Sequence, residues 1–299
     1  MRDDRLLNYL HLHFIVFIWG FTAVLGALIS IDSVPLVWYR MLIAVVMIVV
    51  YMKVKKVPFQ FSGVHKLSRK RLLSICLAGA VIALHWITFF GAIKVSNVSV
   101  TLAMMSTGAF FTALLEPLFT PKKLVWYELV FGVVIIGALY YIFQVETQYV
   151  LGMILGLISA FLSATFSIMN VTFAKDHPPS MISFYELLSG VVLLSFFFLL
   201  PQFNFVTPQE LSSDDWLWLV ILASICTAYA FIASVKVMKF LSAYTVMLTT
   251  NLEPVYGILL AFLILGDAEQ MTPHFYIGAL VILCVIILNG FIKTRFKRK

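Results

Sequence analysis

Long apolar stretches follow one another along the whole chain, separated by short polar segments. Each is close to the length of about 20 mainly apolar residues that a helix needs to cross the hydrocarbon core of a membrane. None has the alternating pattern of the strands of a membrane β-barrel. The pattern predicts an all-α integral membrane protein with ten transmembrane helices, near residues 10–29, 35–52, 72–91, 97–118, 124–143, 151–173, 181–200, 216–237, 242–265 and 271–292.

A constant offset of 146 residues relates the two halves of the chain, through loops as well as apolar stretches. Identical pairs at this offset include Tyr39 and Tyr185, Ser96 and Ser242, Val100 and Val246, and Gly132 and Gly278. We therefore predict two five-helix repeats, over residues 1–146 and 147–299. Because each repeat has an odd number of crossings, the second must be inverted relative to the first, an arrangement typical of secondary transporters.

Composition and charge agree with a membrane location. Hydrophobic residues make up 62% of the chain and charged residues 12%, with a mean hydropathy of +1.01. The net charge of +7 does not indicate nucleic acid, because all Lys and Arg residues except Arg40 and Lys94 fall on one side of the predicted topology. Cytoplasmic loops are enriched in these residues, so we expect a multi-pass inner-membrane protein with both termini in the cytoplasm.

Motifs for catalysis or metal binding are missing from the sequence. The three cysteines lie within apolar stretches and have no CxxC or Cys/His spacing, so we expect neither a disulfide nor a metal site. The sequence contains no HExxH motif and no nucleotide-binding loop. We expect no cofactor and no enzyme activity, and a membrane-embedded enzyme or receptor is the distant alternative to a transporter.

Short motifs in both halves resemble the EamA branch of the drug/metabolite transporter superfamily. They are Trp19-Gly20, Tyr39-Arg40-Met41-Leu42, Asn251-Leu252-Glu253-Pro254 and Leu265-Gly266-Asp267. The resemblance implies ten helices, a central cavity formed by spans one to four and six to nine, peripheral spans five and ten, and the movement of small metabolites, usually outward. Thr120-Pro121-Lys122 departs from the Gly-Glu-Arg that family members often have after span four, which puts the geometry of that loop in doubt.

Glu253 is the main candidate for a functional residue. It lies eleven residues into the ninth span, roughly 16 Å deep at the helical rise, and an ionisable residue at this depth suggests function. Thr249, Thr250 and Tyr256 lie three or four residues away, so we expect a polar stripe that faces the cavity. The alternative is a neutral glutamic acid that only bonds to a neighbouring helix.

Two predicted hinges follow from the same region. Pro254 cannot donate a backbone hydrogen bond to Thr250, and its partner at the 146-residue offset is Gly108, which also weakens a helix. Both halves thus have a predicted break near the middle of the membrane, as in the discontinuous helices of transporter sites.

The fourth span presents Thr107 and Phe110 on the face that corresponds to the Glu253 stripe, beside Phe111. We therefore expect one polar wall and one apolar, aromatic wall. Such a cavity suits an amphipathic organic solute better than a bare ion.

Two further residues have open interpretations. Arg40 lies close enough to the end of its span either to extend to the membrane surface or to hold a carboxylate in the cavity. His85 can titrate near neutrality, or it can be a core histidine with one bonded nitrogen. We interpret Trp86 and Phe89 as packing residues, and the repeated Gly, Ala and Ser positions of the sixth span as a helix-packing stripe.

The sequence thus predicts a permease that moves small organic metabolites, such as amino acids or related compounds, by alternating access. If transport is coupled, the expected ion is the proton, exchanged at Glu253. An uncoupled facilitative carrier is the close alternative. The expected partners are a small-molecule substrate and the lipid bilayer, without nucleic acid, and the sequence leaves a monomer and a homodimer equally open.

Overall fold

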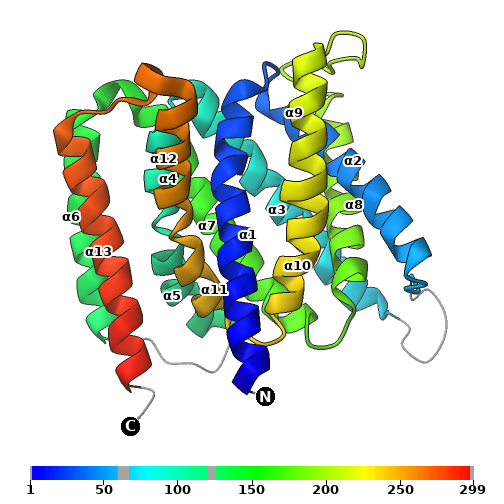
Figure 1. Ribbon diagram of the computed structural model, residues 1–299, viewed down its shortest axis with the longest axis horizontal. Helices are drawn as coiled ribbons and strands as arrows, with labels where there is room; N and C mark the ends of the chain where they lie inside the picture. The colour runs from blue at the N-terminus through cyan, green and yellow to red at the C-terminus, as the bar shows by residue number, and fades with distance from the viewer. Residues whose placement is uncertain (1, 60–66, 120–125, 297–299) are drawn as a thin grey trace.

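The chain folds into a bundle of helices (Figure 1). We analysed a computed structural model that describes residues 2–59, 67–119 and 126–296, which contain no strand. Its helices are α1 (Arg2–Leu28), α2 (Ser33–Val54), α3 (Arg69–Val95), α4 (Val98–Met105), α5 (Gly108–Phe119), α6 (Trp126–Val145), η1 (Thr147–Tyr149), α7 (Val150–Phe173), α8 (Pro179–Phe197), α9 (Ser213–Ala223), η2 (Ser224–Tyr229), α10 (Ala230–Val237), α11 (Ala243–Thr250), α12 (Glu253–Leu265), η3 (Gly266–Glu269) and α13 (Pro273–Phe296). Thr120-Pro121-Lys122 lies outside the described residues.

Within the described residues, eight helical stretches are long and apolar enough to cross a membrane, and two shorter apolar stretches cover residues 130–144 and 273–285. Large apolar side chains point outward from the bundle, among them Leu73, Leu199 and Leu263, each at least 70% exposed. A soluble protein rarely exposes this much contiguous apolar surface, whereas lipid tails cover it at no cost. The protein is therefore a multi-pass membrane protein.

The helices run roughly alongside one another (Figure 1). The start of α1 and the end of α13 lie at the same end of the bundle, which we call the terminal end; the opposite end is the distal end. Helices α6 and α13 pack against each other at one edge of the bundle. The other long helices surround the larger hydrophobic core.

The fourth and ninth spans are interrupted close to their middles. Helix α4 ends at Met105 and α5 begins at Gly108, while α11 ends at Thr250 and α12 begins at Glu253. Pro254 lies in the first turn of α12, where its missing N–H is tolerated. In the first half, the carbonyl of Met104 accepts both from the backbone nitrogen of Thr107, at 3.1 Å, and from its hydroxyl, at 2.7 Å.

The eighth span contains a further irregularity, because α9 and α10 are joined by the π-helical segment η2. The Thr227 hydroxyl donates to the carbonyl of Leu222, five residues earlier, at 2.7 Å. Single π-helical turns are rare and are frequently found at functional sites.

Glycines allow the two halves to approach closely. Helix α1 of the first half crosses α12 of the second at Gly20 and Gly257, and a Cβ on Gly20 would lie 3.1 Å from the backbone nitrogen of Gly257. Any larger residue would force these helices apart. The contact brings Glu253, one turn before Gly257, next to the first half of the chain.

Candidate functional site

A cavity of about 60 Å³ lies between the two halves, which exceeds the roughly 10–15 Å³ that one water molecule needs. Its walls come from α1 to α4, α7, α10, α11 and α12, and from Met238 just after α10. The polar lining residues are Thr22, Arg40, His85, Ser163, Ser167, Ser234, Thr250 and Glu253, and the aromatic ones are Trp19, Trp86, Phe89, Phe166 and Phe231. Helices α6 and α13 do not contribute to the lining.

Arg40 enters the cavity from α2 and is 1% exposed, so it does not extend to the membrane surface. Its Nε donates to the hydroxyl of Thr227 at 2.6 Å, and its Cζ lies 3.8 Å from the ring centroid of Trp86. A guanidinium over a tryptophan face gains a cation–π interaction. The Nη1 atom is buried without a hydrogen-bond partner among the described residues, so one donor of the guanidinium is unsatisfied.

The position of Arg40 depends on the π-helical segment η2. Thr227 lies in η2 and turns its own proton toward Leu222, so its oxygen is free to accept from Arg40. One end of the guanidinium is thereby fixed by Thr227 and one face by Trp86. The unpartnered Nη1 atom is consequently held in place before any ligand arrives.

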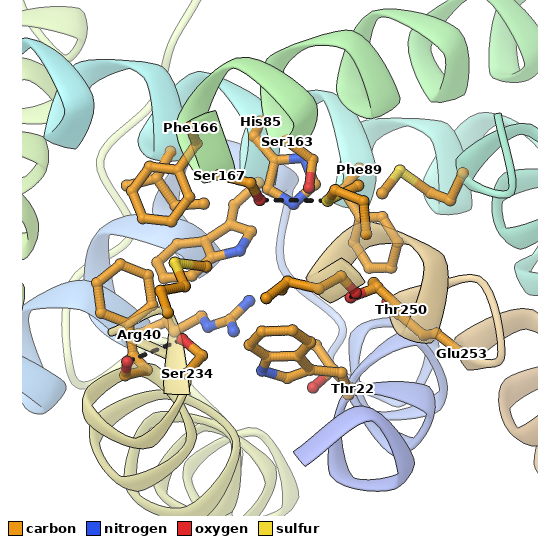
Figure 2. Close-up of a pocket in the computed structure, with 18 residues that line it drawn as sticks. Thr22, Arg40, His85, Phe89, Ser163, Phe166, Ser167, Ser234, Thr250 and Glu253 are labelled. Atoms are coloured by element: carbon orange, nitrogen blue, oxygen red, sulfur yellow. Dashed lines mark hydrogen bonds between the residues drawn. The ribbon is translucent and has the colours of Figure 1, made fainter. Parts of the chain in front are cut away.

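Glu253 is the first residue of α12 and approaches the cavity from the side opposite Arg40 (Figure 2). It is 7% exposed. Among the described residues it has no hydrogen-bond or salt-bridge partner, although its charge interacts with that of Arg40 at a longer range. A carboxyl and a guanidinium thus face one cavity without neutralising each other directly.

His85 lies on α3 with its Nδ1 atom 2.9 Å from the carbonyl oxygen of Ser159. The Ser159 hydroxyl in turn lies 3.0 Å from the His85 carbonyl oxygen. The Ser159 hydroxyl also lies 2.8 Å from Nδ1, so Nδ1 either donates to the Ser159 carbonyl or accepts from the Ser159 hydroxyl, according to the tautomer. No described residue binds Nε2, and the side chain lines the cavity (Figure 2). His85 is therefore a bonded core histidine whose second ring nitrogen has no partner among the described residues.

Four of the predicted site residues lie outside the cavity lining. Thr249 donates to the carbonyl of Thr245, and Tyr256 packs edge-on against Phe17 of α1, with ring centroids 5.5 Å apart. The predicted polar stripe used regular helical spacing across the break that was itself predicted at Pro254. The chain is interrupted between Thr250 and Glu253, and of the four stripe residues only these two line the cavity.

The residues predicted for the apolar wall do not line this cavity. Thr107 is fully buried, and its hydroxyl donates to the carbonyl of Met104. Phe110 packs against α6, where a Cβ on Gly132 would lie 2.5 Å from its ring. Met105 is the fourth span's contribution to the lining, and the aromatic wall comes instead from α1, α3, α7 and α10.

Several lining residues were missed or interpreted as packing. Trp86 and Phe89 line the cavity, as do Ser163 and Ser167, which the sequence analysis placed in a packing stripe. The 146-residue offset could have identified Phe231, because it is the counterpart of the predicted site residue His85 and lines the same cavity. Trp19, Thr22, Phe166 and Ser234 had no such signal.

Comparisons with known proteins agree with this architecture. The model of the EamA-like transporter family matches residues 8–144 and again residues 150–291. No curated protein matches the chain. A solved structure described as "Crystal structure of protein" has a TM-score of 0.67 and 14% sequence identity, covering 95% of this chain and 97% of that chain. At this identity the likeness supports the fold alone.

Proposed function

The chain belongs to the EamA-like transporter family, and from this premise we propose that it moves a small amphipathic organic acid, such as an amino acid, by alternating access. The family makes it a membrane transporter of the drug/metabolite type. We further propose ten crossings of the inner membrane with both termini in the cytoplasm. The Lys and Arg distribution and the shared position of the start of α1 and the end of α13 support this topology.

The unpartnered Nη1 atom of Arg40 is the observation on which the substrate class rests. A buried charged donor without an acceptor is costly, and a carboxylate is the organic group that best satisfies a guanidinium. We propose that Arg40 binds the carboxylate of the solute. The ring faces that surround it then contact the apolar part of the solute.

Glu253 supplies the complementary charge. On the opposite side of the cavity, its carboxyl can accept from an ammonium group or take up a proton when no ammonium is bound. Exchange of a proton for a cationic group at one carboxyl links the two movements. We propose this exchange as the coupling step, with His85, Thr250 and Ser234 as additional hydrogen-bonding groups.

The interruptions at Gly108 and Pro254 provide the proposed hinges. Neither half of an interrupted span needs to break a regular helix in order to rotate, since the helix is already reduced to turns at these points. A cavity of about 60 Å³ holds only a few waters. An amino acid therefore requires movement about these points to enter.

Glu253→Gln tests the coupling. In proteoliposomes we expect the variant to retain exchange of labelled solute and to lose the response to a pH gradient, since the amide cannot release a proton. Exposed Glu210 in a loop offers the matched control, Glu210→Gln, which should behave like the wild type. A pH-driven uptake that is unchanged in Glu253→Gln would contradict coupling at this residue, and a wild type that ignores the gradient would identify an uncoupled carrier.

Arg40→Gln tests the substrate class. Loss of a charge-assisted hydrogen bond costs about 2 kcal/mol, which corresponds to a roughly 30-fold weaker apparent affinity. The solute is first found by saturable counterflow among labelled amino acids and related acids. The wild type should discriminate against the solute's neutral amide analogue, and Arg40→Gln should not. Equal discrimination by both proteins would contradict the proposal that Arg40 binds a carboxylate.

A further inference from the structure

A second buried polar pair lies outside the cavity, in the part of α7 and α8 nearest the terminal end. Asn170 on α7 and Glu186 on α8 are both 0% exposed. The amide nitrogen of Asn170 donates to Oε1 of Glu186 at 2.7 Å. The two remaining oxygens of the pair, Oδ1 of Asn170 and Oε2 of Glu186, are buried and have no hydrogen-bond partner among the described residues.

If Glu186 is ionised, these two oxygens cannot form a hydrogen bond with each other. A carboxylate oxygen and an amide oxygen are both acceptors, so neither can satisfy the other. In the described part of the chain, no Lys, Arg or His pairs with Glu186. A buried and unpaired carboxylate is far more costly than a buried carboxylic acid.

A single proton between the two unpartnered oxygens would give both of them a hydrogen bond. Bound to Oε2, it turns that atom into a donor, and the amide oxygen of Asn170 becomes its acceptor. The acid and the amide would then be joined by two hydrogen bonds in opposite directions, of which the structure already contains one. We propose that Glu186 and Asn170 form a proton-binding site separate from the central cavity.

The surroundings of the pair leave few other charges to consider. From α3, the titratable neighbour of Glu186 is Cys76, which is uncharged as a thiol. Arg40 on α2 is directed toward Thr227, and Lys236 on α10 is exposed. The proton is thus the neutralising charge that the described surroundings of Glu186 leave available.

Close packing links the proton to the contact between helices. A Cβ on Gly79 of α3 would lie 2.1 Å from the carbonyl oxygen of Glu186. Ser189 donates to carbonyls on both helices, those of Cys76 and Glu186. Ionised Glu186 needs water, and water has no room unless α3, α7 and α8 separate. Proton release at Glu186 therefore favours opening toward the terminal end.

Infrared difference spectroscopy on the purified full-length protein at neutral pH tests the proposal without a substrate. The wild-type spectrum minus that of Glu186→Gln should contain the carbonyl-stretch band of a protonated carboxylic acid. The same difference should appear when both proteins also carry Glu253→Gln, which shows that the band does not come from the cavity and does not depend on the proposed function. Asn170→Ala should shift the band, since the acid loses its amide partner.

Thermal denaturation adds a second measurement. A glutamine at position 186 can still donate to Asn170, so Glu186→Gln should denature near the wild-type temperature while Glu186→Ala denatures earlier. An ionised carboxylate band assigned to Glu186 in the wild type would overturn the proposal. So would a sodium-dependent stabilisation that Glu186→Gln abolishes, because the site would then bind a metal cation.

Discussion

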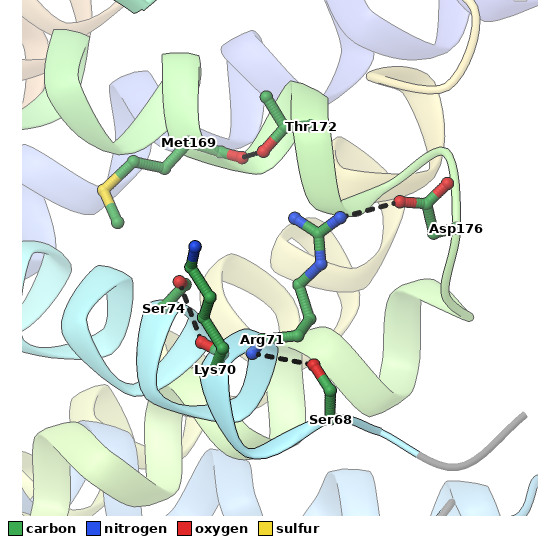
Figure 3. Close-up of polar contacts among 7 residues, drawn as sticks. All are labelled: Ser68, Lys70, Arg71, Ser74, Met169, Thr172 and Asp176. Atoms are coloured by element: carbon green, nitrogen blue, oxygen red, sulfur yellow. Dashed lines mark hydrogen bonds and ion pairs between the residues drawn. The ribbon is translucent and has the colours of Figure 1, made fainter.

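The two ends of the bundle are closed by contacts at closely corresponding positions with different chemistry. At the distal end, Ser30 after α1 contacts Asp215 at the start of α9. The 146-residue offset takes Ser30 to Asp176 and Asp215 to Arg69, and at the terminal end Asp176 pairs with Arg71 at the start of α3 (Figure 3). Each contact joins one half of the chain to the other.

The distal contact is the better shielded of the two. Asp215 is 2% exposed and accepts four hydrogen bonds, two from Ser30 and two from Ser212. The Arg71–Asp176 ion pair, at 2.9 Å, involves side chains that are 35% and 54% exposed. Solvent and salt weaken an exposed ion pair much more than a buried network.

A second carboxylate reinforces the distal end. Glu269 accepts from the backbone nitrogens of Val98 and Ser99, at 3.0 and 2.8 Å, and so caps the start of α4. A negative charge at a helix N-terminus is favourable. The difference between the ends indicates that the terminal end separates more readily, with the distal end as the firmer closure.

Of the substitutions at the two ends, Asp215→Ala should lower the stability of the protein most. Its removal leaves the donors of Ser30 and Ser212 without their acceptor, and we expect a loss of about 2–3 kcal/mol in the free energy of unfolding. Thermal denaturation in detergent measures it. The neighbouring exposed Asp214 provides the control, and Asp214→Ala should be close to neutral. Equal losses of stability in the two variants would mean that Asp215 contributes no more to stability than an exposed surface residue.

Glu269→Ala should lower the stability of the protein by an intermediate amount. Two backbone N–H groups at the start of α4 lose their acceptor, at a cost of about 1–2 kcal/mol, and α4 leads directly into the proposed hinge at Gly108. Asp267 is exposed in the same segment, so Asp267→Ala serves as the matched variant. A lower denaturation temperature in the Asp267 variant than in the Glu269 variant would contradict the capping role.

Much of this architecture follows from sequence pattern. Apolar length predicts where helices lie, and the offset of 146 predicts both interruptions, since Gly108 and Pro254 weaken a helix whatever surrounds them. The same offset relates the contacts at the two ends. These features depend on local backbone chemistry and on repetition, which the sequence displays directly.

The orientation of side chains about the cavity could not be predicted in the same way. Tyr256 packs against Phe17 of α1, although its spacing from Glu253 within the same helix predicted a shared face. Arg40 is held by Thr227, and the π-helical turn that presents Thr227 has no sequence signature that we could identify. Both outcomes depend on how the helices pack together.

Arg71→Ala should have the smallest effect on stability and the clearest dependence on salt. An exposed ion pair contributes less than about 1 kcal/mol, and salt screens it. The wild-type denaturation temperature should therefore fall slightly as salt rises, and Arg71→Ala should show less of this dependence. Lys70 is adjacent and has no ion-pair partner in the described part of the chain, so Lys70→Ala should keep the wild-type response. If Arg71→Ala destabilised the protein as much as Asp215→Ala, the two ends would be equally firm, and the terminal end would have no preference to open first.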